Sequence, residues 1–368
     1  MKHYEKLLLA LMLPLCVSCV HDHQEPKFNG RPEELSLPVM ARIISELPMD
    51  GENFKEVHEA VSSSSDNGYD EEYMMSDLIE SPGSGVGDVF LPTRSSSYSR
   101  PMRELLAEYF EEHALTRTGG TDACLEALSA SDMQIYWPYS ENWDGKAAPV
   151  ITFDPQTGED SNYGYEPGSG KRVEVTEELA RERPVWVVNL NDDSEYTPVD
   201  FFERASADSE EEGKMLSIRS IKALRNYDSW FGGASEFFVK CGAVDGFRAK
   251  TEEEMRNYHP EVTDFMVVVK RNQVGKTIPF NALLLSDYTP QMEKIAFLVT
   301  EDDGGTVNTW DCEAVVKYSS KSYGFNLSIP YRDKDDIVWR GQLSRAFFEG
   351  KDTVEGRFGD MVITFDLR

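Results

Sequence analysis

Cysteine and histidine are scarce in this chain, which has five cysteines and six histidines among 368 residues. No HExxH pair is present, so the helical zinc motif of metalloproteases is not indicated. No G-x-S-x-G motif is present, so the nucleophile elbow of an α/β-hydrolase is not indicated either. Cys124, Cys241 and Cys312 lie far apart, which predicts free thiols rather than a disulfide framework, although one long-range bridge remains an alternative.

Positive charge is also in short supply. Lys and Arg number 37 against 66 Asp and Glu, which gives a formal net charge of −29. Nucleic-acid binding depends on Lys and Arg neutralising phosphates, so we exclude a nucleic-acid partner. The negative charge favours solubility, and cation binding is the alternative interpretation. Apolar residues make up 40% of the chain, with 19 Phe, 16 Tyr and 6 Trp, which is enough for folded cores.

The apolar run at the start of the chain is short. Leu7 to Leu15 spans nine residues, whereas a helix that crosses a bilayer needs about 20. The run follows Lys2 and Lys6, and its length is typical of the apolar part of a secretory signal. We therefore predict a signal peptide over residues 1–18.

The residues after this run carry the clearest motif of the chain. Ser18 is a small residue directly before Cys19, and this arrangement resembles the lipobox of bacterial lipoproteins. The resemblance implies cleavage after Ser18 and acylation of Cys19, which would hold the protein on a membrane. The third position before the cysteine is usually Leu and is Cys16 here. Cys16 itself follows Pro14-Leu15, a poorer context, so we prefer Cys19.

Two alternatives to a lipid anchor are a plain secretory signal and an uncleaved short anchor. In general style the chain resembles uncharacterised envelope lipoproteins of Bacteroidetes, which implies attachment to the outer membrane.

The body is expected to be an α+β protein with a helical N-terminal region, a mixed middle region and a C-terminal antiparallel β-sandwich. The predicted segments are a tether at 19–32, a helical region at 33–130 with a linker at 81–101, a short-strand region at 131–205 and a β-sandwich at 215–368. The acidic stretch 206–213 is predicted to be a domain boundary or a long loop.

Apolar residues at helical spacing predict the helices. Residues 37–47 place their apolar side chains on one face, with Ser36 as the predicted N-cap. A second helix is expected to end before the polar run 62–73. Residues 102–113 have the clearest helical pattern, and Thr121 is predicted to cap a short helix after it.

The strands are predicted from short apolar runs separated by Gly, Asp, Asn and Pro. These runs begin near Gln134 and recur at regular spacing through the C-terminal third, without crossover helices between them. Such a pattern is typical of an antiparallel β-sandwich or barrel.

Acidic turns of the C-terminal region suggest a calcium site. One turn follows a strand at Glu301, and a second follows Tyr331. Calcium takes six to eight oxygen ligands, and acidic loops at one edge of a β-sandwich can supply them. The arrangement loosely resembles the calcium loops of C2-type sandwiches, although Lys334 interrupts the second cluster, and solvated turns are the alternative. The candidate ligands are Asp302, Asp303, Asp311, Asp333, Asp335 and Asp336.

Aromatic residues of the middle region suggest a ligand surface. Tyr136, Trp137 and Trp143 could stack on sugar rings, with core packing as the alternative. The sequence therefore predicts a lipid-anchored binding or structural module with a glycan or envelope-protein partner and no catalytic residue. The alternative is a hydrolase that acts on glycans or peptides through paired carboxylates, and the sequence selects no such pair.

Overall fold

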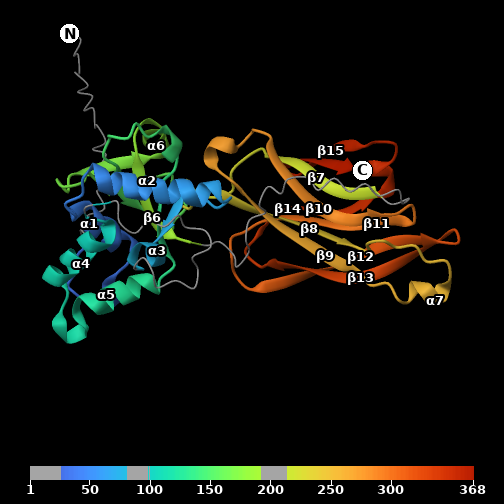
Figure 1. The fold of residues 1–368 in the computed structure, drawn as a ribbon, viewed down its shortest axis with the longest axis horizontal. Helices are drawn as coiled ribbons and strands as arrows, with labels where there is room; N and C mark the ends of the chain where they lie inside the picture. Colours follow the sequence, from blue (N-terminus) through green and yellow to red (C-terminus); the bar gives the residue numbers. More distant parts are fainter. Residues whose placement is uncertain (1–25, 81–97, 99, 192–213) are drawn as a thin grey trace, which may run out of the picture.

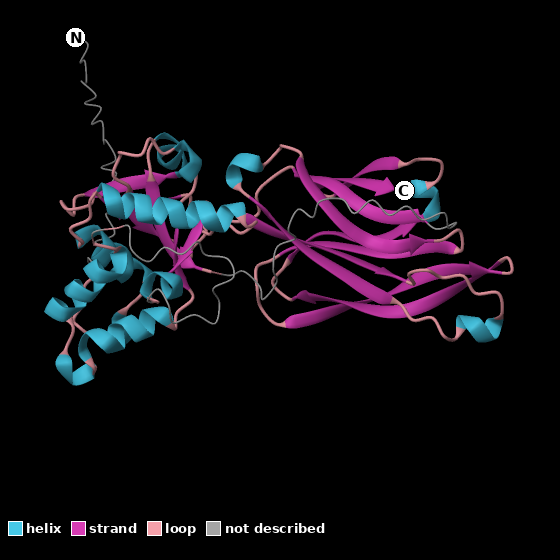
Figure 2. Cartoon of the chain, viewed as in Figure 1, coloured by secondary structure: helices cyan, strands magenta, loops and turns pink. Residues whose placement is uncertain are grey.

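The computed structural model describes residues 26–80, 98, 100–191 and 214–368. These residues form two units that lie end to end (Figure 1). We call the described residues up to 191 the α/β unit and residues 214–368 the β unit. Helices are concentrated in the first and strands in the second (Figure 2), which confirms the α+β class. The predicted signal, Cys19 and the stretch 206–213 lie outside the described residues.

A six-stranded sheet organises the α/β unit. Its strand order is β1-β2-β6-β3-β4-β5; β3 and β6 pair in parallel, and the other neighbouring described strands pair antiparallel. The strands are β1 Glu72–Met74, β2 Met133–Tyr136, β3 Val150–Phe153, β4 Ser161–Tyr165, β5 Arg172–Thr176 and β6 Val185–Leu190. Because β1 comes from the predicted helical region, that region and the short-strand region form one unit with a shared core.

Both faces of this sheet are covered, which explains its uninterrupted apolar runs. On β6, Trp186 packs with the helices α1 to α5, and its neighbour Val187 faces the opposite side. That opposite side is closed by Ala180 of α6 and by two aromatic residues of the β unit, Trp230 and Phe231. The helices are α1 Leu37–Glu46, α2 Gly51–Asp66, α3 Met75–Ile79, α4 Met102–His113, α5 Gly120–Ser129 and α6 Glu177–Glu182.

The predicted helix positions are partly confirmed, and the predicted helix ends and N-caps differ from those in the structure. Helices α1 and α4 occupy the expected positions, but the Ser36 side chain makes no capping hydrogen bond. Helix α2 is capped by Asp50, whose side chain accepts from the Glu52 amide, and it continues to Asp66. The predicted break after residue 61 is therefore wrong, because packing of α2 against β1 overrides the weak helix propensity of the serines. Helix α5 begins at Gly120, so Thr121 is not its cap.

The β unit consists of two antiparallel sheets, as predicted for a β-sandwich. One has the order β10-β7-β16-β15, and the other has the order β13-β12-β11-β8-β9 with β14 also paired to β11. A large apolar cluster lies between them. The strands are β7 Lys214–Ala223, β8 Ser235–Ala243, β9 Glu261–Val269, β10 Ile278–Tyr288, β11 Met292–Glu301, β12 Val307–Tyr318, β13 Lys321–Arg332, β14 Asp336–Ser344, β15 Thr353–Phe358 and β16 Met361–Leu367, with short helices α7 Glu252–Met255 and α8 Arg345–Phe348.

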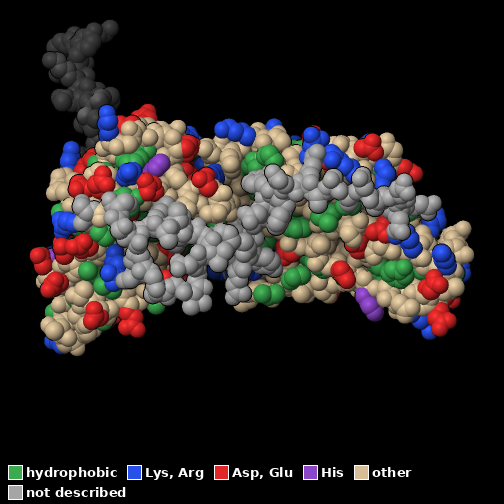
Figure 3. Space-filling view, viewed as in Figure 1, with side chains coloured by type: hydrophobic (Ala, Val, Ile, Leu, Met, Phe, Trp, Pro, Cys, Tyr) green, Lys and Arg blue, Asp and Glu red, His purple; other side chains and the backbone are tan. Residues whose placement is uncertain are grey.

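Three further sequence predictions concern thiols, membrane spans and charge. Cys124, Cys241 and Cys312 are free thiols, and the first two are buried. Among the described residues, no helix is both long and apolar enough to span a bilayer. Acidic and basic side chains are interspersed over the face of both units seen in Figure 3.

Candidate metal centre

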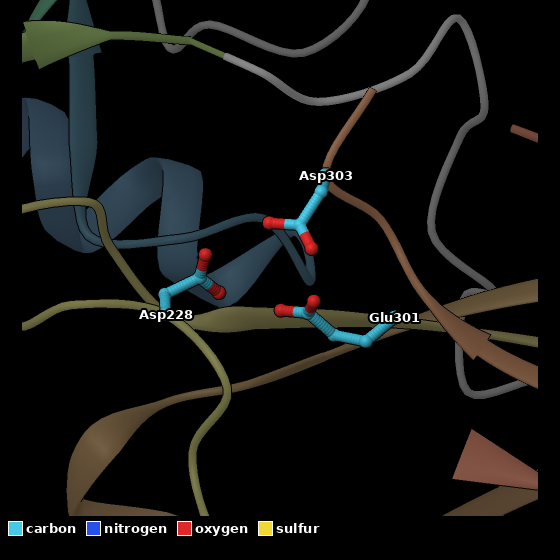
Figure 4. Close-up of side chains that lie close together, drawn as sticks. All are labelled: Asp228, Glu301 and Asp303. Atoms are coloured by element: carbon cyan, nitrogen blue, oxygen red, sulfur yellow. The ribbon is translucent and has the colours of Figure 1, made fainter. Parts of the chain in front are cut away.

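Three carboxylates converge where the β unit meets the α/β unit. Asp228 lies on the segment 224–234 between β7 and β8, which we call the junction loop. Glu301 is the last residue of β11, and Asp303 follows it two positions later. One oxygen of each of these three carboxylates lies within 4.8 Å of the other two, and the side chains point toward one another (Figure 4).

Strand pairing sets the position of Glu301. At its end, β11 lies between β8 and β14, so Glu301 is opposite both Phe237 and Asp336. This central position leaves the Glu301 side chain 0% exposed, and the adjacent Asp302 is 1% exposed. Asp303 lies beyond the strand and is exposed. The cluster is therefore closed at Glu301 and open to solvent at Asp303.

Glu301 has an unsatisfied carboxylate. Within the described part of the chain, neither of its carboxylate oxygens has a hydrogen-bond partner, and Oδ2 of Asp228 also lacks one. A buried polar group left unpaired costs about 1–3 kcal/mol, and more when it is charged. Two ionised carboxylates cannot hydrogen-bond to each other, so the facing oxygens need either a shared proton or a cation.

The protonation of this cluster follows from burial. Burial is the main cause that raises the pKa of Glu301, and the contact with Asp228 raises that pKa further. Burial also raises the pKa of Asp228. Partial burial, followed by repulsion from Asp228 and Asp336, raises the pKa of Asp303 to about 6. A divalent cation favours the ionised forms, so it would bind here in competition with protons.

A second acidic pair lies beside the first cluster. Burial and then the neighbouring Asp302 raise the pKa of Asp335 to about 6. Oδ1 of Asp302 accepts from the Gly304 amide at 3.0 Å and lies 4.0 Å from Nε of Arg332. Arg332 already supplies a positive charge beside this pair, so a metal ion would stabilise it less than it would stabilise Glu301.

The predicted calcium ligands do not form one site. Asp302, Asp303, Asp335 and Asp336 lie at the end of β11 or directly opposite it. Asp311, in contrast, lies on β12 and accepts from Ser328 Oγ at 2.6 Å. Asp333 accepts from the amide and the hydroxyl of Thr306 at 2.8 and 2.9 Å, so it closes a turn. Asp311 and Asp333 therefore each have a local structural partner, and neither belongs to the cluster of Asp228, Glu301 and Asp303.

Two members of the cluster were missed. Glu301 stands in the acidic run that drew attention to Asp302 and Asp303, but the strand pairing that buries it is a long-range property. Asp228 carries no sequence signal, since it is 73 positions from Glu301 in the chain.

The predicted glycan surface is also wrong for two of its three residues. Tyr136 and Trp137 are 1% and 0% exposed, so neither ring has a face for a sugar. Trp143 is half-buried; its indole donates to the Ala147 carbonyl at 2.8 Å, and its ring packs against those of Trp137 and His58. These aromatic residues form core, the alternative named above.

The geometry suits a hard divalent cation bound by oxygen. Calcium binds oxygen at about 2.3–2.6 Å, so two ligands of one ion lie at most about 5 Å apart. The spacing within 4.8 Å of Asp228, Glu301 and Asp303 meets that condition. Three carboxylates can supply up to about six oxygens when each binds through both of its own. Full burial of Glu301 leaves no face for a glycoside, so the paired-carboxylate hydrolase gains no support here.

No family model, curated protein or solved structure matches this chain. The chemistry of the site therefore carries the functional argument.

Proposed function

We propose that this chain is a lipid-anchored cell-envelope protein, held by Cys19 and displayed at the outer membrane, and that its body is a non-catalytic module that binds calcium. The observation that carries the calcium assignment is the Glu301 carboxylate, which is 0% exposed, accepts no hydrogen bond from the described residues on either oxygen, and faces Asp228 and Asp303.

The position of the first described residues supports the display role. Phe28 packs against Tyr109 and Phe110 of α4, with ring centroids 6.4 and 5.6 Å apart. Pro26 lies seven positions after Cys19, and a chain of that length reaches at most about 25 Å. Because α4 lies at the end of the α/β unit away from the β unit (Figure 1), a lipid on Cys19 leaves the β unit facing outward.

Calcium binding is tested on the full chain purified in detergent. We expect isothermal titration calorimetry to give one calcium ion per chain after treatment with a chelator. Calcium at 100 times its dissociation constant should stabilise the protein by about 2.7 kcal/mol, which raises its melting temperature. Absence of heat and of any thermal shift at millimolar calcium would exclude the site.

Two variants locate the binding. Asp303→Asn removes the exposed ligand without disturbing the core, so it should weaken calcium binding and abolish most of the thermal shift. Asp311→Asn is the matched control, because Asp311 lies in the same unit but outside the cluster. Equal calcium affinity in both variants would place the ion elsewhere.

Lipid attachment is tested by metabolic labelling with palmitate and by detergent phase partitioning. Cys19→Ala should lose the label and move to the aqueous phase. Cys16→Ala is the matched control and should keep both properties. Labelling that survives Cys19→Ala would refute the assignment of the anchor to this residue.

A further inference from the structure

The junction loop belongs to the β unit by its sequence position but contributes side chains to the core of the α/β unit. Trp230 is 2% exposed and Phe231 is 0% exposed, and both pack with Tyr136, Val150 and Val187 on the sheet face opposite α1. The indole of Trp230 donates to the carbonyl of Asp160 at 2.9 Å. The loop therefore fills a position that a helix would otherwise cover.

Hydrogen bonds from the α/β unit hold the backbone of the same loop. The side-chain amide of Asn189 donates through Nδ2 to the carbonyls of Phe231 and Gly232 at 3.2 and 2.6 Å. The Ala234 amide donates to the buried carboxylate of Asp70 at 2.9 Å. These bonds join strand β6 and the segment before β1 to residues 231–234, so the loop cannot shift without breaking contacts in both units.

Arg271, two positions after the end of β9, also holds the backbone of the junction loop. One of its Nη atoms donates to the carbonyls of Ser229 and Gly233, each at 3.2 Å, and more weakly to that of Asp228 at 3.4 Å. Its Nε donates to Glu177 of α6 at 2.9 Å. A single guanidinium thus links the β unit, the junction loop and the α/β unit.

We infer that calcium at Asp228, Glu301 and Asp303 acts as a latch between the two units. The inference rests on the proposed calcium site and adds a role for it. Asp228 sits on the loop and Glu301 on β11, so an ion bound to both ties the loop to the β unit. Two residues further along, Trp230 ties the same loop to the α/β unit. Without the ion, this tie between the loop and β11 is lost, and the docking of the loop loosens.

Coupling of this kind is reciprocal. If calcium strengthens docking of the loop in the α/β unit, then docking of the loop strengthens calcium binding by the same factor. A change at Trp230, whose side chain packs in the core of the α/β unit, should therefore lower the affinity for calcium. If the ion only binds the three carboxylates and has no role in docking, a change at Trp230 should leave the calcium affinity unchanged.

The decisive experiment measures calcium affinity by calorimetry in full-length Trp230→Phe and Trp230→Ala. Trp230→Ala should bind calcium at least about fivefold more weakly than the wild type, within the usual range of coupling. Trp230→Phe keeps an aromatic ring but loses the hydrogen bond to the Asp160 carbonyl, so we expect a smaller loss of calcium affinity. This variant replaces Trp230→Ala in the test if Trp230→Ala does not fold. Trp143→Ala, also in the α/β unit but away from the loop, is the control and should keep wild-type affinity.

Hydrogen exchange in the wild type gives an independent readout. Calcium should slow amide exchange in the junction loop and in β6 of the α/β unit. Wild-type affinity in both Trp230 variants, together with slowing confined to residues 228 and 301–303, would overturn the latch and leave the calcium site intact. Absence of calcium binding in the wild type would overturn both.

Discussion

Asp228 and Trp230 are two residues apart on one loop, yet their side chains lie in different units. The carboxylate of Asp228 faces Glu301 at the end of β11, and the indole of Trp230 donates to Asp160 in the α/β unit at 2.9 Å. The chain between them is therefore the shortest covalent path from the acidic cluster to the core of the neighbouring unit. The stability of the α/β unit should consequently depend on residues that follow it in the sequence.

Trp230→Ala tests that dependence. Truncation of a fully packed tryptophan costs about 3–5 kcal/mol, and Trp230 is 2% exposed in the core of the α/β unit. We expect urea denaturation to show that loss, with the α/β unit unfolding first. Trp143→Ala, at a half-buried site, should cost less. A loss below about 1 kcal/mol for Trp230→Ala would show that the ring is not part of that core.

A pH effect is expected at Glu71, which is 4% exposed and accepts from the amide and hydroxyl of Ser140 at 3.0 and 2.7 Å. Burial, and then repulsion from Asp70, raises the pKa of Glu71 from 4.5 to about 8. The folded protein thus keeps a proton that the unfolded chain releases. Stability should therefore fall as the pH rises from about 4.5 to about 8.

Glu71→Gln should remove this part of the pH dependence, since an amide does not ionise and its oxygen can still accept from Ser140. Melting temperatures of the variant and the wild type should diverge between pH 5 and pH 8, with the variant more stable at the higher pH. The exposed change Glu112→Gln should leave the wild-type profile unaltered. Parallel profiles for Glu71→Gln and the wild type would contradict the assigned pKa.

Glu301→Gln tests the role of the buried carboxyl group in calcium binding. The raised pKa of Glu301 keeps a proton on this group when no cation is bound, and the Gln amide can donate to Asp228 in the same way. We therefore expect the variant to be about as stable as the wild type in chelator and to lose the stabilisation that calcium confers on the wild type. Calcium stabilisation that survives Glu301→Gln would show that Glu301 is not a ligand of the ion.

Gly242→Ala tests the packing of the β unit. A Cβ atom at Gly242 on β8 would lie 2.1 Å from Cδ1 of Leu327, so one side chain must move. Overpacking typically costs about 1–3 kcal/mol, and the loss should lie near the lower end because the contacting atom ends a flexible, half-buried side chain. Leu327→Ala in the same chain should restore part of the loss, and Gly51→Ala, where no atom lies within 4 Å of the added Cβ, is the control. Additive losses in the double variant would exclude this contact as the cause.

The sequence predicted features that depend on local pattern. Helices α1 and α4 follow from apolar spacing, and the strands of the β unit follow from short apolar runs between turns. Features that depend on long-range pairing were not predictable. The polar end of α2 is helical because it packs on β1, and Tyr136 and Trp137 are buried because β2 is covered on both faces. Asp228 joins Glu301 only after both sheets have formed, so no local pattern indicated it.

The aromatic pair Trp230 and Phe231 also has a consequence for the order of folding. A chain that emerges with its N-terminus first exposes residues 26–191 before the two rings that complete their sheet have appeared. Until residue 231 emerges, one face of β2, β3 and β6 lacks part of its cover, and a fragment that ends at residue 191 would keep part of that apolar face in contact with water. Maturation of the earlier unit must therefore wait for synthesis of the later one.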